Sequence, residues 1–112
     1  MNLEEEIYGI LQATGINVYP GVATQNASLP FIIYNLVDEV KIFGLTGIAN
    51  AQANRFQVDV YTKTSKERKD ISLLVEAQLG LSSISSILYG SKNSISDDEY
   101  RKTMDIKLWS NN

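Results

Sequence analysis

The segment from Asn54 to Thr64 constrains the fold more than any other part of the chain. Apolar and polar residues alternate strictly along it, with Phe56, Val58 and Val60 on one side and Arg55, Gln57, Asp59 and Tyr61 on the other. Such alternation, with β-branched and aromatic residues, predicts a strand with one buried face. Thr64 and Glu67 then stand three residues apart, the spacing of a helix capping box. The sequence therefore predicts a strand that leads directly into a helix.

Two helices are predicted from apolar residues at helical spacing. The first would begin at Asn2, which can cap it together with Glu5, and would end at Gly15. Its buried face would comprise Leu3, Ile7, Ile10 and Leu11. The second would follow the capping box and end at Gly80. Its buried face would comprise Ile71, Leu74, Val75 and Leu79.

Four more segments predict extended structure. Residues 16–20 form a short piece that Pro20 confines to a sheet edge or a strand end, because proline cannot donate to a central ladder. Residues 29–37 are at first apolar on both faces, which predicts helices on one side and either more of this chain or a neighbouring subunit on the other. Residues 87–89 predict a short strand followed by a turn at 90–93. The closing segment 100–109 alternates, with Met104, Ile106 and Leu108 inward and Arg101, Thr103, Asp105 and Lys107 outward.

The predicted order is α-β-β-β-α-β-β. It corresponds to an α+β fold in which two helices pack on one face of a mostly antiparallel sheet of four to five strands. We expect residues 1–112 to form a single domain, because the chain is long enough for one core and no more. The opposite face of the sheet would be polar and carry charges of both signs, which could pair across neighbouring strands.

The segment from Asp38 to Ala53 is predicted to be a long loop between two strands. It exceeds the usual hairpin loop of about 2–5 residues, and loops of such length are commonly functional. Its apolar residues are Val40, Ile42, Phe43, Leu45 and Ile48. They predict either a contact surface that orders on binding or a loop that folds back and buries them in its own core.

The composition excludes several classes of function. The chain has no cysteine and no histidine, which removes thiolate and imidazole chemistry and the usual zinc ligands. Asp97, Asp98 and Glu99 lack the spacing of a calcium loop. With a net charge of −3 and no basic cluster, the chain is not expected to bind nucleic acid sequence-specifically. No apolar run reaches the roughly 20 residues of a membrane span. We therefore expect no catalytic residues, cofactor, metal or membrane contact.

Three segments resemble the tail-completion (tail-terminator) proteins of long-tailed bacteriophages. The first runs from Val18-Tyr19-Pro20 through Ala23-Thr24-Gln25 to Leu29-Pro30-Phe31-Ile32-Ile33-Tyr34. The second is Arg55-Phe56-Gln57-Val58-Asp59-Val60-Tyr61 with Thr64, and the third is the closing strand ending at Leu108-Trp109. Thr24 stands where proline is common in that family, and Thr62 and Ser65 replace alanine and tyrosine.

The resemblance implies a structural, non-enzymatic virion protein of the head–tail neck that is assembled in the host cytoplasm. Such proteins form a ring, often of six copies, that caps the tail tube, stops its polymerisation and presents a docking surface to the head connector, with DNA passing through the lumen. The implied partners are further copies of the chain, the tail tube protein and the head connector. Candidate interface residues are Ile42, Phe43, Leu45 and Ile48 in the predicted loop, and Arg55, Asp59, Tyr61, Arg101 and Asp105 on the polar sheet face.

A second reading is a small cytosolic ligand- or protein-binding domain, monomeric or dimeric, because a two-layer α+β sheet supports many unrelated functions. An enzyme is the third reading. It would have to use carboxylates, lysine or tyrosine, and the sequence shows no convergent set of them.

Overall fold

The computed structural model describes residues 3–24, 27–43, 49–82, 84–97 and 99–111. Two helices and five strands follow one another along the chain. In order they are α1 (Leu3–Gln12), β1 (Asn17–Pro20), β2 (Phe31–Phe43), β3 (Ala49–Thr62), α2 (Ser65–Leu81), β4 (Ser85–Ser96) and β5 (Glu99–Asn111).

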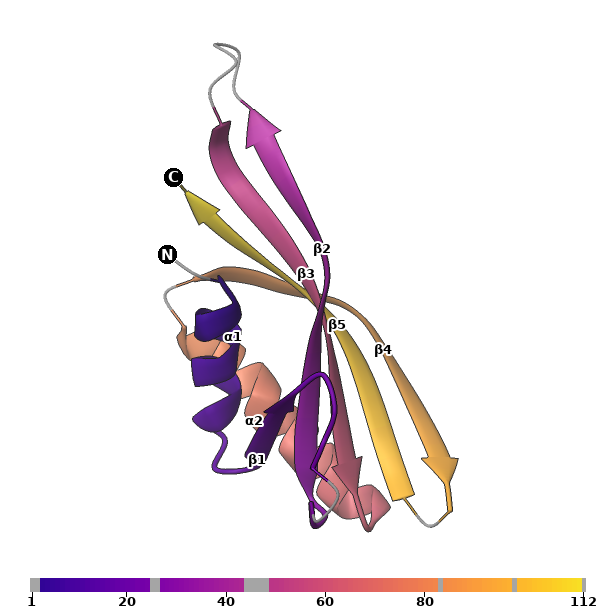
Figure 1. Ribbon diagram of the computed structural model, residues 1–112. Coiled ribbons are helices and arrows are strands. Elements are labelled where there is room, and N and C mark those ends of the chain that lie inside the picture. The colour runs from indigo at the N-terminus through magenta and orange to yellow at the C-terminus, as the bar shows by residue number, and fades with distance from the viewer. Residues whose placement is uncertain (1–2, 25–26, 44–48, 83, 98, 112) are drawn as a thin grey trace.

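The five strands form one sheet in the order β1-β2-β3-β5-β4. The β1–β2 pair is parallel and the other three pairs are antiparallel. Both helices lie against the same face of this twisted sheet (Figure 1). The predicted α+β class, element order and helix placement are confirmed, and Pro20 ends β1 at a sheet edge as expected. Among the described residues, neither helix has the length and hydrophobicity required to cross a membrane.

The strand-to-helix joint has the predicted geometry. Phe56, Val58 and Val60 are fully buried on the helix side of β3. At the start of α2, the Glu67 backbone N–H donates to Thr64 Oγ1 at 3.0 Å, and the Lys63 backbone N–H donates to Glu67 Oε1 at 3.1 Å. These bonds satisfy backbone donors that a helix start leaves unpaired, so the helix begins immediately after the strand.

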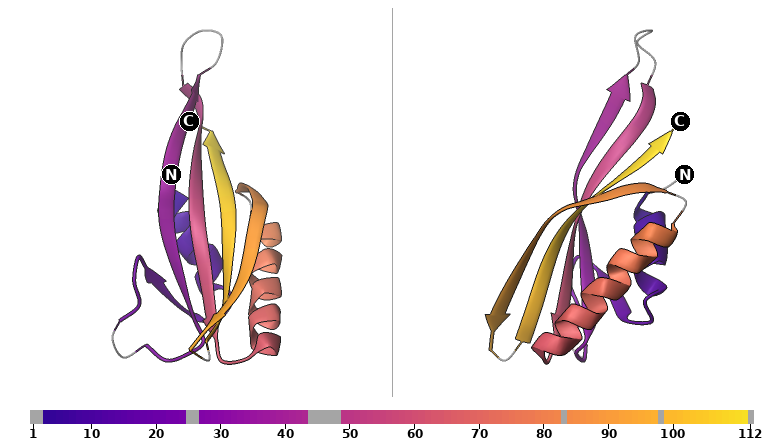
Figure 2. Two further views of the ribbon diagram at one scale, coloured as in Figure 1. Left: turned by 90° about the vertical axis from the view of Figure 1, so that its right-hand side faces the viewer. Right: turned by 180° about the vertical axis from the view of Figure 1, so that it is seen from behind.

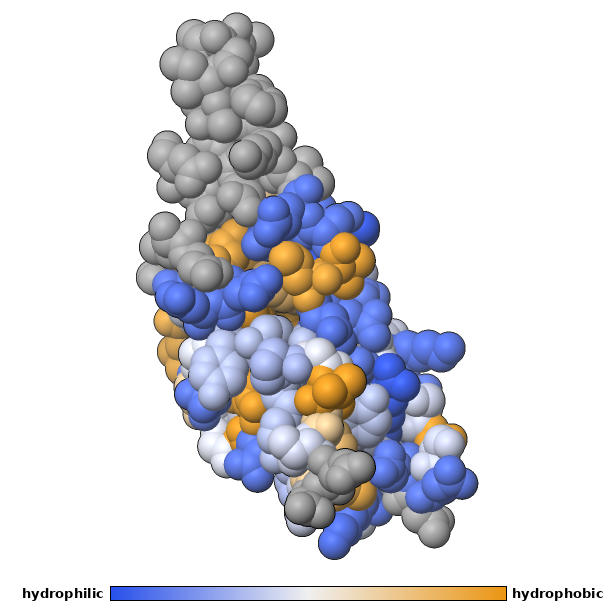
Figure 3. Space-filling model, viewed as in Figure 1, coloured by the Kyte–Doolittle hydropathy of each residue, from blue (hydrophilic) through white to orange (hydrophobic). Residues whose placement is uncertain are grey.

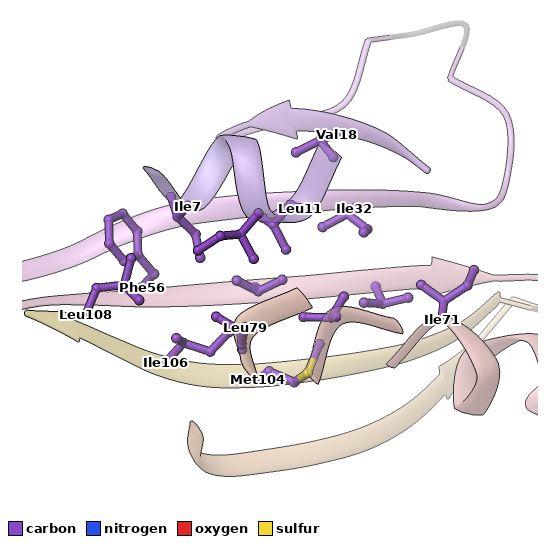
Figure 4. Packing of buried hydrophobic residues seen from close by; sticks show 14 of the residues in the cluster. Ile7, Leu11, Val18, Ile32, Phe56, Ile71, Leu79, Met104, Ile106 and Leu108 are labelled. Atoms are coloured by element: carbon purple, nitrogen blue, oxygen red, sulfur yellow. The ribbon is translucent and has the colours of Figure 1, made fainter. Parts of the chain in front are cut away.

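The hydrophobic core fills the space between the two helices and the inner face of the sheet (Figure 4). Every strand except the edge strand β4 contributes a fully or almost fully buried side chain to it. Its buried members are Leu3, Ile7, Ile10, Leu11, Val18, Ile32, Phe56, Val58, Val60, Ile71, Val75, Leu79, Met104, Ile106 and Leu108. The inward residues predicted for β3, β5 and the first helix all belong to this core.

The prediction that Leu74 belongs to the buried face of α2 is wrong. Leu74 is 43% exposed, whereas Ser72 is buried and donates from Oγ to the Arg68 carbonyl at 2.6 Å. Position 72 therefore follows Ile71 onto the sheet side, while position 74 turns toward solvent. A serine is tolerated there because its hydroxyl bonds to the preceding helical turn instead of remaining unpaired.

The prediction that Asp38 to Ala53 form a loop is also wrong, because most of this segment belongs to two strands. β2 continues to Phe43 and β3 begins at Ala49, and the two strands remain paired throughout. This extension, residues 38–43 with 49–54, is called the arm here. It projects beyond the part of the sheet that the helices cover (Figure 1). The radius of gyration, 15.0 Å, accordingly exceeds the about 13 Å of a compact domain of this length.

β4 is longer than predicted. It spans Ser85–Ser96, and the expected turn at 90–93 is instead strand paired with β5. The register shifts between Leu88 and Gly90, so Tyr89 lies in a bulge. The chain reverses at Asp97, whose φ is 49°. The serine-rich sequence of this segment lacks the hydrophobic pattern of a strand. The segment is a strand because it pairs with its neighbour β5.

Candidate interaction surface

The sheet face opposite the helices carries most of the predicted polar interface residues and is called the open face here. Among the described residues, no helix covers it, and the left view of Figure 2 looks onto it. On its two central strands it presents Arg55, Gln57, Asp59 and Tyr61 from β3, and Arg101, Thr103, Asp105 and Lys107 from β5. The antiparallel register places Tyr61 opposite Arg101 and Asp59 opposite Thr103.

Asp59 is the centre of a hydrogen-bond network on this face. Its Oδ1 accepts from Arg101 Nε at 3.1 Å, from Arg101 Nη2 at 3.0 Å and from Thr103 Oγ1 at 2.6 Å. Its Oδ2 accepts from Gln57 Nε2 at 3.2 Å. Only 5% of the Asp59 side chain is exposed, against 39% of Arg101. A carboxylate this buried requires such partners, because an unpaired buried charge is strongly destabilising.

A row of rings crosses the sheet beside this network. The Arg101 guanidinium lies 5.3 Å from the centroid of the Tyr61 ring, and Phe31 stacks on the other side of Tyr61 at 5.0 Å. Tyr19 meets Phe31 edge-on at 6.0 Å. Burial raises the pKa of the Tyr61 hydroxyl; the Arg101 guanidinium acts in the opposite direction, and the Asp59 and Glu99 carboxylates raise the pKa further. The row joins β1, β2, β3 and β5 into one continuous surface.

The row of rings explains why β2 begins with apolar residues on both of its faces. Ile32 points into the core, whereas Phe31 and Ile33 lie on the open face opposite Tyr61 and Asp59. Both are only 9% exposed. Their cover on this side comes from this chain's own neighbouring side chains, which is one of the two alternatives that the sequence left open.

A second ion pair lies nearer the arm. Arg55 Nε donates to Asp38 Oδ1 at 2.8 Å and to Oδ2 at 2.9 Å, and Arg55 Nη2 also contacts Oδ2. The hydrogen bond from Arg55, with its positive charge, lowers the pKa of the Asp38 carboxyl. The pair exists because β2 has a register shift between Leu36 and Asp38. The extra residue, Val37, changes the alternation and returns Asp38 to the open face.

Lys107 and Asp105 occupy the β5 side of the open face. The Lys107 ammonium lies 5.8 Å from the Tyr89 ring centroid and 5.7 Å from that of Trp109. Asp105 lies opposite Gly90, where an added β-carbon would stand 3.3 Å from Asp105 Oδ2. Within the described part of the chain, Asp105 has no ion-pair partner.

The structure brings together only some of the predicted interface residues. Asp59, Tyr61 and Arg101 form one cluster, whereas Arg55 pairs with Asp38 instead. The backbones of Ile42 and Phe43 lie in β2, and their side chains fall outside what is described. Leu45 and Ile48 lie outside the described residues altogether.

Sequence reasoning placed Lys107 on this face correctly but missed several other members of the surface, namely Tyr19, Phe31, Asp38 and Tyr89. Phe31 could have been found, because it is an apolar residue on the strand face opposite Ile32. Asp38 and Tyr89 could not, because the faces on which they lie depend on β-bulges that the sequence pattern does not predict. The described residues contain no group of acidic, histidine or cysteine side chains that could hold a metal ion.

Figure 3 shows the molecule from the side of Figure 1, toward the β1 edge of the sheet and not onto the open face. On this side, hydrophobic patches are separated by hydrophilic areas and do not merge into one large apolar region. Contacts on such a side would depend on matched charges and hydrogen bonds as much as on apolar area.

The sequence matches no protein-family model and no curated protein. The fold, however, is similar to that of solved structures. A chain in the virion of a native gene transfer agent particle matches 95% of this chain and 92% of its own length, with a TM-score of 0.66 and 16% identity. The gp17 protein of bacteriophage SPP1 matches 98% of this chain and 89% of its own length, with a TM-score of 0.59 and 13% identity. The fold described above is thus shared with a chain of a virion particle and with a bacteriophage protein.

Proposed function

We propose that this protein is a structural component of a phage or prophage virion, a tail-completion protein of the head–tail neck. In this proposal residues 1–112 act as one domain, and copies form a ring, of six subunits in the family that the sequence resembles. The ring caps the tail tube, stops addition of tube subunits and offers a docking surface to the head connector. The role is geometric and requires no catalysis, cofactor or metal.

The observation that carries the proposal is the fold likeness over nearly the whole of both chains. The likeness to the virion chain covers 95% of this chain, and the likeness to the bacteriophage protein covers 98% of it. The sequence resemblance to tail-completion proteins rests on different information, namely short motifs in order and spacing. The two lines support the same class of protein.

The shape is suited to assembly. A ring requires two different surfaces on each subunit, because head-to-tail contacts never use the same patch twice. The arm projects beyond the helix-covered body, and the open face lies on the side away from the helices.

The net negative charge of the chain is suited to a conduit for DNA. An acidic chain lining such a conduit would offer few partners to DNA phosphates, so DNA would slide past it. Replacing lumen carboxylates by lysine would then impede DNA ejection, and unchanged ejection would contradict this part of the proposal.

The first test is light scattering coupled to size-exclusion chromatography at low and high protein concentration. A mass that corresponds to a stable ring supports the proposal. A tight dimer would instead favour the ligand- or protein-binding domain. If the protein is monomeric at both concentrations, it is added to purified tail tubes and tube length is measured by electron microscopy; unchanged tube growth would refute the proposal.

A double variant tests the contribution of Phe43 and Leu45. Phe43→Ser with Leu45→Ser should leave the fold intact and block ring formation or tail capping. Leu74→Ser is the matched control, because it alters an exposed apolar side chain on α2. Normal termination by the double variant would show that these two residues are not part of the interface.

A further inference from the structure

The two lateral edges of the sheet carry clefts of opposite charge. At the β1–β2 edge, α1 and the sheet enclose a cleft of about 350 Å³, called the acidic cleft here. It is lined by Glu4, Glu5, Tyr8, Pro20 and Tyr34. The rings of Tyr8 and Tyr34 lie 6.1 Å apart within it. None of its described lining residues is a cation.

The acidic cleft suits a long cationic side chain. Lysine buries its methylene stem on apolar or aromatic surface and keeps its ammonium near a carboxylate or water. Tyr8, Tyr34 and Pro20 supply the surface, and Glu5, which is exposed, supplies the charge. Burial raises the pKa of the Tyr34 hydroxyl, and the Glu4 carboxylate raises it further, in agreement with a negative potential there.

At the β4 edge, α2 and the sheet enclose a second cleft of about 190 Å³, called the basic cleft here. It is lined by Ser65, Arg68, Lys69, Asn93 and Lys102. Arg68 is held in place, with its guanidinium 5.4 Å from the Tyr100 ring centroid and a hydrogen bond of 3.3 Å to the Ser94 carbonyl. Lys69 and Lys102 have no ion-pair partner within the described part of the chain. No carboxylate is among the described lining residues of this cleft.

The two clefts lie at opposite lateral edges of the sheet. In the left view of Figure 2, β1 marks one lateral edge of the molecule, and α2 with β4 marks the other. The sheet order agrees, because β1 and β4 are its outermost strands. A subunit with complementary patches on opposite sides can contact a second copy head to tail and still leave one patch of each sign unused.

Simple strand addition is disfavoured at β1 and at β4, the strands beside the two clefts. β1 has four residues and ends at Pro20, and β4 has a bulge at Tyr89 and carries the exposed Lys92. Proline, bulges and lysine are features that prevent a strand edge from pairing with another chain. Contact between copies at these edges would therefore depend on side chains, which is where the charge complementarity lies.

We propose that copies of this chain associate head to tail, with the basic cleft of one subunit docked on the acidic cleft of the next. The Lys69 side chain lies along the surface that the contacting Tyr8 and Tyr34 rings form and approaches Glu5, and Lys102 adds positive charge behind it. This inference rests on the proposed ring function and specifies its subunit contact. It lies at the lateral edges of the sheet and adds to the contacts proposed above for the arm and the open face.

Cysteine cross-linking tests this contact directly, because the natural chain contains no cysteine. Glu5→Cys and Lys69→Cys are made in separate chains, mixed and oxidised. We expect a disulfide-linked dimer from the mixture in clear excess over either variant alone. Glu76→Cys mixed with Lys63→Cys is the matched control, because both positions are exposed and line neither cleft.

Charge reversal tests the electrostatic part. Glu5→Lys and Lys69→Glu should each weaken self-association about tenfold or more, because each places like charges opposite one another. Mixing the two variants should restore association, since each then offers the charge that the other needs. Glu76→Lys and Lys63→Glu should have little effect. Circular dichroism checks that every variant is folded.

The outcomes separate this contact from the proposed function. A wild-type ring or normal tail capping, with cross-linking no greater than in the control pair and no effect of charge reversal, would overturn the cleft contact and leave the proposed function standing. Cross-linking and charge rescue that yield a closed dimer instead of a ring would support the contact but contradict the tail-completion role. Absence of self-association both in solution and on tail tubes would overturn both.

Discussion

Arg101 and Asp59 lie on adjacent strands, and the guanidinium of Arg101 donates from Nε and Nη2 to a single carboxylate oxygen of Asp59, at 3.1 and 3.0 Å. The carboxylate is almost completely buried, although it lies on a sheet face that the helices do not cover. Neighbouring side chains of the same sheet therefore shield it. The pair fixes the alignment of β3 and β5 at the centre of the open face.

We expect Asp59→Ala to lower the free energy of unfolding by about 1.5–3 kcal/mol, because hydrogen bonds to a charged group are lost and Thr103 and Gln57 lose an acceptor. Urea unfolding measures this loss. Asp105→Ala is the matched control on the same face and should cost less than about 0.5 kcal/mol. Equal losses for the two variants would show that the Asp59 network contributes no special stability.

Asp38 should show its pairing with Arg55 in its titration. The hydrogen bond from Arg55 lowers the Asp38 pKa in the folded protein below the ordinary value of 3.8. A lowered carboxyl pKa stabilises the fold above the unfolded-state pKa, and this contribution disappears as the pH falls through the folded-state pKa. Nuclear magnetic resonance titration of the side-chain carboxyl measures the shift directly.

Replacing the partner provides the comparison for Asp38. In Arg55→Gln the Asp38 pKa should return toward its ordinary value, and the stability difference between this variant and the wild type should shrink below about pH 4. An unchanged Asp38 titration in Arg55→Gln would mean that the pair does not persist in solution.

Tyr34 should ionise at higher pH than an ordinary tyrosine. Burial raises its pKa above 10.0, and the carboxylate of Glu4 adds to the effect. Because the folded-state pKa is raised, the associated stability is complete below the unfolded-state pKa and is lost as the pH rises through the folded-state value. Phenolate absorbance, compared with that of Tyr34→Phe, isolates this group.

Glu4→Gln should lower the Tyr34 pKa without restoring it fully, because burial is the larger cause. A Tyr34 titration that does not respond to this change would place the carboxylate too far from the ring to matter. Leu73→Gln is a suitable control, since it changes an exposed position of α2 and leaves the charge of α1 unaltered.

Two leucines on the same helix should respond differently to truncation. Leu79 is 7% exposed and belongs to the core, so Leu79→Ala should cost about 2–5 kcal/mol. Leu74 is 43% exposed, so Leu74→Ala should cost less than about 1 kcal/mol. Thermal and urea unfolding of both variants measure the difference. Similar losses would mean that Leu74 is buried as the sequence pattern predicted.

The sequence alone determined the parts of the fold whose cause is local. The alternating residues Phe56, Val58 and Val60 predict β3, because successive side chains of a strand point to opposite faces. Thr64 and Glu67 predict the start of α2, because a capping box satisfies backbone donors of its first turn. The α+β class followed from the order of such elements. The sequence allowed opposite charges to pair across these strands only if the strands were neighbours, and the structure places β3 beside β5 with Asp59 bound to Arg101.

Only the tertiary structure decided the features that depend on non-local pairing. The arm and β4 are strands because a neighbouring strand completes their backbone hydrogen bonds, although neither has the hydrophobic pattern of a half-buried strand. Arg55 pairs with Asp38 because an extra residue at Val37 changes which face the next residues occupy. The opposite charges of the two edge clefts likewise arise from which helix lies over which edge of the sheet. The residue pattern of one strand carries none of this information, because the energy of a strand pair or a bulge depends on the partner strand as well.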